Sequence, residues 1–243
     1  MHGLTRSPTA SHSPTCSNTL TFNNDNVDNS NRGACDQDPG LTGRTAITLF
    51  KGSDTVQLND SAHDDAPAPS SSPAYSIVDL TAAYGPQNSS RVERGFAFSE
   101  SYEHLLIVDE FEFSAGSSVG NVTWTMHTMA AVKLSHRLSH KLLEPAGGAG
   151  GGGAAAVLSL GGVRLHATVI EPEGADFSTA PVSLLPPFKS SAGVSKLQVH
   201  LPVAPKGAMR IVVGLSLSAV AATVTPRRLA EWKTLGPFAA VGQ

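Results

Sequence analysis

The sequence is poor in charge, in aromatic residues and in cysteine. Of its 243 residues 15% are charged, 6% are aromatic and two are cysteines, and the net charge is −3. No cluster of lysine and arginine approaches the density of a nucleic-acid-binding surface, so DNA and RNA partners are not expected. The longest apolar run, over 211–224, is broken by glycine, serine and threonine. It falls short of the roughly 20 apolar residues that a membrane span needs, so no membrane partner is expected.

The cellular compartment stays open on the sequence alone. Residues 1–14 contain no apolar segment of the kind found in a secretory signal. Cys16 and Cys35 are compatible with one disulfide in an oxidising compartment and equally with two free thiols. Asn-x-Ser/Thr sequons, which favour secretion only slightly because they arise often by chance, begin at Asn59, Asn88 and Asn121.

Short segments of alternating polar and apolar residues run through most of the chain. The segments 91–98, 105–113 and 122–128 have a period of two, and a Gly-Ser turn over 116–120 joins the last two. That period places Ile107, Asp109, Phe111 and Phe113 on one strand face. Helical periodicity is limited to a short stretch over 227–233. Many short strands separated by turn residues predict an all-β fold, an antiparallel multi-stranded β-sandwich with long irregular loops and little helix.

Composition divides the chain into a sandwich and two tails. Residues 1–14 are expected to form a flexible N-terminal tail, and residues 226–243 a C-terminal tail. The sandwich is expected over 15–225, with a Gly/Ala-rich loop over 146–156 that cannot hold a packed core by itself.

Four motifs occur in an order that is characteristic of one family. The chain carries V-D-L-T-A-A-Y, R-V-E-R, L-L-I-V-D-E-F and W-T-M-H-T at 78–84, 91–94, 105–111 and 124–128. This succession resembles the C-terminal β-sandwich of the heparinase II/III-like polysaccharide lyases. Members of that family cleave uronic-acid polysaccharides, such as heparan sulfate or alginate, by β-elimination. They combine this sandwich with a helical toroid that carries most of the catalytic residues.

The resemblance implies a role in the degradation of acidic polysaccharides and weakly favours a secreted protein. No series of amphipathic helices corresponds to a toroid, so we expect the sandwich portion of a lyase, inactive without a helical toroid domain as its companion. Whether this chain is itself an enzyme stays open. The alternative is a non-catalytic carbohydrate-binding or structural β-sandwich module.

Four residues are candidates for substrate binding, and none is expected to be catalytic in this chain alone. β-Elimination needs a base for the C5 proton, a group that neutralises the uronate carboxylate and an acid for the leaving oxygen. Histidine, tyrosine and arginine suit these tasks, so the candidates are His127, Arg91, Arg94 and Tyr84.

Each candidate also has a structural interpretation. Tyr84 would be a strand-end aromatic packed over the sheet edge, and the two arginines would be at the surface or paired with Glu93 and Glu110. His127 would be a hydrogen-bonded histidine inside or at the rim of the sandwich.

No cofactor is expected. In relatives with a metal in the sandwich, the resemblance implies a histidine ligand in an H-N-T-L strand. Here Ser17 occupies that position, and a serine hydroxyl is a poor ligand for a divalent transition metal. Asp109 and Glu110 together could bind a hard cation, although one buried and one solvated acid is the expected arrangement.

Overall fold

The computed structural model describes residues 20–22, 46–51, 74–84, 89–99, 102–135, 154–182, 193–201, 207–218 and 225–238. The strands are β1 (Leu20–Phe22), β2 (Ala46–Lys51), β3 (Tyr75–Asp79), β4 (Ser89–Phe98), β5 (His104–Phe113), β6 (Val122–Thr128), β7 (Ala131–Ser135), β8 (Ala155–Leu160), β9 (Val163–Glu171), β10 (Phe177–Pro181), β11 (Ser195–Leu201) and β12 (Ala208–Ser216). The helical elements are α1 (Thr81–Tyr84), the 3-10 turn η2 (Leu229–Glu231) and α2 (Trp232–Leu235).

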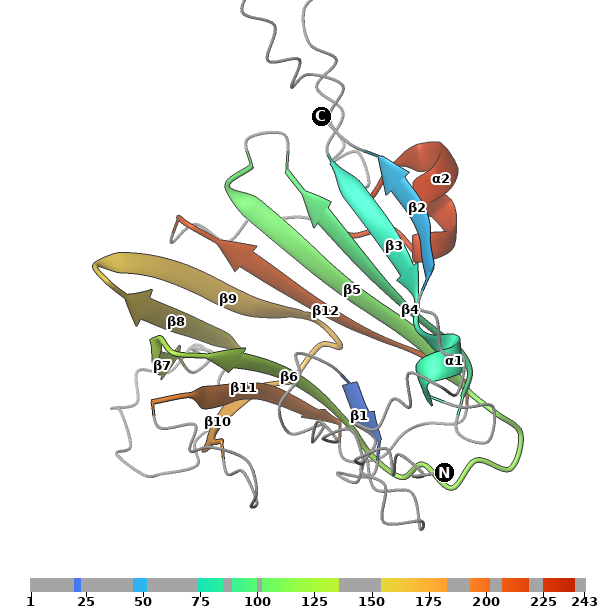
Figure 1. Cartoon of the computed structure of the whole chain (residues 1–243), viewed down its shortest axis with the longest axis horizontal. Coiled ribbons are helices and arrows are strands. Elements are labelled where there is room, and N and C mark those ends of the chain that lie inside the picture. The colour runs from blue at the N-terminus through green and yellow to red at the C-terminus, as the bar shows by residue number, and fades with distance from the viewer. Residues whose placement is uncertain are drawn as a thin grey trace, which may run out of the picture.

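The strands form two sheets packed face to face (Figure 1). The small sheet has the order β1-β6-β11-β10, and the large sheet has the order β2-β3-β4-β5-β12-β9-β8-β7. All pairings between these strands are antiparallel. The predicted all-β antiparallel sandwich is therefore confirmed.

Two of the connections that cross between the sheets are short. Only Met129 and Ala130 separate β6 of the small sheet from β7 of the large sheet. Residues 172–176 likewise separate β9 from β10. These short crossings bring the edge strands β7 and β10 to the same side of the sandwich.

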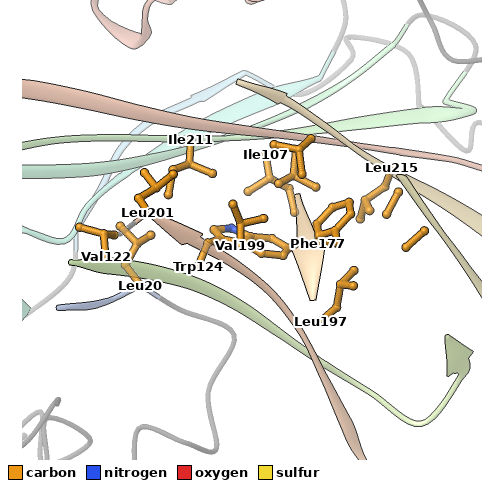
Figure 2. Packing of buried hydrophobic residues seen from close by; sticks show 14 of the residues in the cluster. Leu20, Ile107, Val122, Trp124, Phe177, Leu197, Val199, Leu201, Ile211 and Leu215 are labelled. Atoms are coloured by element: carbon orange, nitrogen blue, oxygen red, sulfur yellow. The ribbon is translucent and has the colours of Figure 1, made fainter. Parts of the chain in front are cut away.

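The core lies between the sheets and consists of the inward-facing residues of both (Figure 2). On β5 the inward residues include Ile107, Asp109 and Phe111, as the period of two predicts. The largest apolar side chain of the core is Trp124 of β6, which is 2% exposed. The labelled core residues are Leu20, Ile107, Val122, Trp124, Phe177, Leu197, Val199, Leu201, Ile211 and Leu215.

Residues 225–238, which we call the C-terminal strap, pack on the outward face of the large sheet. Leu229 and Trp232 are completely buried there against a second apolar cluster that includes Ile77 and Val108. The strap fits because Gly95 has no side chain: a Cβ at this position would lie 2.7 Å from Trp232 Cη2. Residues that composition places in the C-terminal tail thus cover part of the sheet.

Several expectations from the sequence lie outside the described residues. They include the predicted N-terminal tail (1–14), both cysteines and Ser17. Of the Gly/Ala-rich stretch, residues 146–153 are also outside. Ala155 and Ala156, which composition assigns to that loop, are instead the first residues of β8.

Candidate functional site

Arg94 lies inside the sandwich and is paired with Asp109. The two residues face each other on β4 and β5. The Arg94 guanidinium donates two hydrogen bonds to the carboxylate, Nε to Oδ1 at 2.7 Å and Nη2 to Oδ2 at 3.0 Å. Arg94 is 9% exposed and Asp109 is completely buried. Two parallel charge-assisted bonds of this kind hold the guanidinium in one orientation, within the protein interior.

Opposing effects act on the protonation of this pair. Burial raises the pKa of Asp109, whereas the Arg94 guanidinium and the Trp124 indole act in the opposite direction. Asp109 in turn raises the pKa of Arg94 despite its burial, and the Tyr84 phenol adds to that effect. Arg94 therefore carries its charge in the core, and breaking the pair would leave that charge uncompensated.

Tyr84 reaches the same interior region and ties β1 to the sandwich. Its hydroxyl donates to the Leu20 carbonyl at 3.0 Å and accepts from the Leu20 amide at 3.2 Å. Its ring lies 4.9 Å from the Phe22 ring. The residue reaches this position because the Asp79 carboxylate accepts from the Thr81 amide at 2.8 Å and so starts the helical turn α1.

Arg91 lies on the opposite, outward face of the large sheet, among carboxylates. It forms ion pairs with Glu93 at 3.1 Å, Glu112 at 3.2 Å and Glu110 at 3.6 Å. The expected pairing with Glu93 and Glu110 is confirmed for Arg91, while Arg94 pairs with Asp109 instead. Burial raises the pKa of Glu93, and the nearby carboxylates of Asp79 and Glu110 raise it further against the opposing effect of Arg91.

Glu110 is the centre of this outward ionic cluster. It is 2% exposed, accepts a hydrogen bond from the Leu229 amide at 3.1 Å and lies 3.4 Å from Arg210 Nε. Arg210 also donates to the Pro226 carbonyl at 3.1 Å. The expectation of one buried and one solvated acid at 109–110 is therefore wrong. Both acids are buried on opposite faces of the sheet, because the C-terminal strap covers Glu110.

His127 lies on the outward face of the small sheet, away from the other three candidates. Its neighbour across β11 is Lys196, and this face also carries a polar pair, Thr123 Oγ1 and His200 Nδ1 at 2.9 Å. Burial lowers the pKa of His200. Neither Lys196 nor His200 was identified from the sequence. The signal that could have found them is the alternation along 195–201, which places both on the face opposite Leu197 and Val199.

The four sequence candidates thus occupy three places. Arg94 and Tyr84 come together in the interior, Arg91 lies on the outward face of the large sheet, and His127 lies on the outward face of the small sheet. Across the part of the chain that the structure describes, no three His, Cys, Asp or Glu residues are grouped closely enough to hold a metal ion. No helix in the same residues is long and apolar enough to cross a membrane.

Comparison with known proteins shows a similar fold in part of two larger proteins. No family model matches the sequence, and no curated protein matches it. Among solved structures, a heparinase III with methylated lysines matches with a TM-score of 0.53 and 12% identity. Heparan sulfate lyase HepC from Pedobacter heparinus matches with a TM-score of 0.52 and 10% identity. These alignments cover 89% and 86% of this chain.

The chain therefore has a β-sandwich fold of the kind that these two proteins contain. More specifically, its sheets resemble part of heparinase III and of heparan sulfate lyase HepC, as the order of the sequence motifs predicts. The chain spans only 26% and 25% of the length of these two proteins.

Proposed function

We propose that this chain is the sandwich portion of a polysaccharide lyase that acts on uronic-acid polysaccharides by β-elimination, and that it needs a helical toroid domain for turnover. The observation that carries the proposal is the coverage: 83–89% of this chain aligns with only about a quarter of heparinase III and HepC. The order of the four motifs supports the same assignment independently of the coordinates.

The placement of the candidate residues supports the need for a companion domain. β-Elimination requires a base, an acid and a carboxylate-neutralising group around one sugar ring. Here Arg94 is saturated by Asp109, and the Tyr84 hydroxyl is held by Leu20. Arg91 and His127 lie in different sheets. No accessible place among the described residues unites the three chemical roles, so the toroid must supply them.

In this proposal the interior pair and Tyr84 act as supports, and His127 and Arg91 provide contacts with the polysaccharide or the toroid. His127 is the better candidate for such a contact because it shares an outward face with Lys196 and His200, groups that hydrogen-bond or pair with sugar hydroxyls and carboxylates.

The experiment replaces the sandwich of HepC with this chain and follows the absorbance of the unsaturated uronate with heparan sulfate, alginate and chondroitin. The chimera is expected to turn over one of these polymers, while the isolated chain is expected to be inactive. In the chimera, His127→Gln is expected to lower kcat/KM, and Lys233→Gln, at an exposed position of α2 away from this face, serves as the control. Turnover by the isolated chain, or a folded but inactive chimera, would contradict the proposal.

A non-catalytic carbohydrate-binding module is the second candidate. The observation in its favour is the same separation of the four residues. It predicts saturable binding of an acidic polysaccharide by the isolated chain and a chimera without turnover.

A further inference from the structure

A straight row of side chains crosses the outward face of the large sheet beyond the C-terminal strap. Strand register pairs Lys133 of β7 with Val157 of β8, and Val157 with His166 of β9. His166 is in turn paired with Ser216 of β12, and Ser216 with His104 of β5. Figure 1 shows these five strands side by side in the same order.

All five members of this row face outward. The neighbouring residues along each strand, including Leu134, Leu158, Ala167 and Leu215, belong to the core between the sheets. Because side chains alternate along a strand, the row must lie on the other face. Arg164 is on that face too, two residues from His166 on β9. We call Lys133, Arg164, His166 and His104 the basic row.

The charged residues around this row are mostly basic. The segments 131–135, 155–160, 163–170 and 211–216 contain no aspartate or glutamate, and Glu103 is the acid next to His104. Lys133 and Arg164 are exposed, and neither forms an ion pair with a described residue. Glu110 and Glu112 of the outward face lie near the opposite end of β5 around the strap. Lys133 and Arg164 therefore attract anions at the end of the row that is far from these carboxylates.

The spacing of the row matches a linear polyanion. Adjacent strands lie about 4.8 Å apart, so Lys133, His166 and His104, on alternate strands, are spaced by about 10 Å. This spacing is comparable to the rise of one disaccharide in an extended polysaccharide chain. Ser216, between the two histidines, is buried, and its hydroxyl accepts from the Ser218 amide at 3.0 Å, so the contacts with the polymer come from the basic side chains.

We infer that the basic row binds an acidic polysaccharide chain lying across the strands of the large sheet. The inference rests on the proposed function for the substrate class. A nucleic acid is the competing polyanion, and the short, sparse row favours a polysaccharide because a duplex presents a far denser array of phosphates.

The test measures binding of heparin-derived and alginate oligosaccharides to the isolated full chain at low salt, where electrostatic attraction is least screened. The charged residues beside the two histidines are Arg164 and Glu103. Lys133→Ala with Arg164→Ala is expected to weaken binding about tenfold. The matched control, Arg228→Ala with Lys233→Ala on the C-terminal strap, removes the same charge from exposed positions elsewhere and is expected to change binding less than about twofold.

Further variants and a competing polymer distinguish the possible results of this binding experiment. His104→Gln with His166→Gln is expected to weaken binding, because both imidazoles lie in line with Lys133 on the outward face. Equal losses in the basic-row and control variants, or unchanged binding in the basic-row variant, would overturn the inference while leaving the chimera test of the proposed function intact. Tighter binding to a DNA duplex than to heparin would overturn the choice of polymer. Unchanged thermal unfolding of each variant shows that the effects are not due to misfolding.

Discussion

Gly95→Ala should test how the C-terminal strap is held on the large sheet. Gly95 is not in the left-handed region, so alanine is allowed by the backbone and only packing opposes it. The new Cβ would collide with Leu229 Cδ2 and would lie 2.7 and 2.9 Å from Trp232 Cη2 and Cζ3. Overpacking of this kind costs about 1–3 kcal/mol.

The free energy gained by burying Trp232 and Leu229 decides whether the new Cβ displaces the strap. Burial of a tryptophan removes about 200 Å² of surface from water, worth about 5 kcal/mol at about 25 cal/mol/Å², and the leucine adds about 2 kcal/mol as an upper estimate. Because this exceeds the overpacking cost, the strap should stay in place and shift, and the free energy of unfolding should fall by about 1–3 kcal/mol.

The assay is urea unfolding followed by circular dichroism and tryptophan fluorescence, extended to a double-mutant cycle. Leu229→Ala removes the side chain that meets the new Cβ. In the Gly95→Ala background, Leu229→Ala should therefore lower the free energy of unfolding by at least about 1 kcal/mol less than it does in the wild type. Purely additive effects of the two substitutions would refute the close packing of Gly95 against the strap.

Three further predictions follow from the ionic and hydrogen-bonding contacts. Tyr84→Phe loses both hydrogen bonds to β1 and should lower the free energy of unfolding by about 1–3 kcal/mol, measured by urea unfolding. Asp109→Asn leaves the Arg94 charge buried and uncompensated and should cost about 3–5 kcal/mol, whereas replacing both residues with apolar ones should cost clearly less; an equal loss in both would contradict this reasoning. The pKa of Glu93 is raised, so its ionised form opposes folding at neutral pH, and Glu93→Gln should be more stable than the wild type at pH 7 by less than about 1 kcal/mol. Unfolding curves recorded at decreasing pH should show this advantage shrinking as the pH passes the raised pKa of Glu93 in the folded protein. It should vanish below the ordinary glutamate pKa, since the wild-type carboxyl is then neutral in both the folded and the unfolded state.

The fold was predictable from the sequence because alternation along a strand is a local property. The segment 105–113 shows which residues face inward without any knowledge of its partners, and the structure agrees for Ile107, Asp109 and Phe111. The order of the four motifs likewise predicted the heparinase-like sandwich that heparinase III and HepC match at 10–12% identity.

The candidate site was less predictable because it depends on register and on distant segments. Nothing near 91–94 in the sequence shows that Arg94 meets Asp109 while Arg91 meets Glu112, since both outcomes depend on how β4 pairs with β5. The burial of Glu110 follows from a strap more than a hundred residues away. The basic row was also missed, since its members come from three strands, β5, β7 and β9, that are spread over 104–171.

The short crossing between β6 and β7 has a consequence for association between copies of the chain. It places β7 at the edge of the large sheet, where unpaired backbone groups could template pairing with another molecule. Lys133, at the middle of this five-residue strand, opposes such pairing, because pairing with β7 of a second copy would bring two lysine charges close together. The same lysine that we assign to polysaccharide binding thus also disfavours edge-to-edge association.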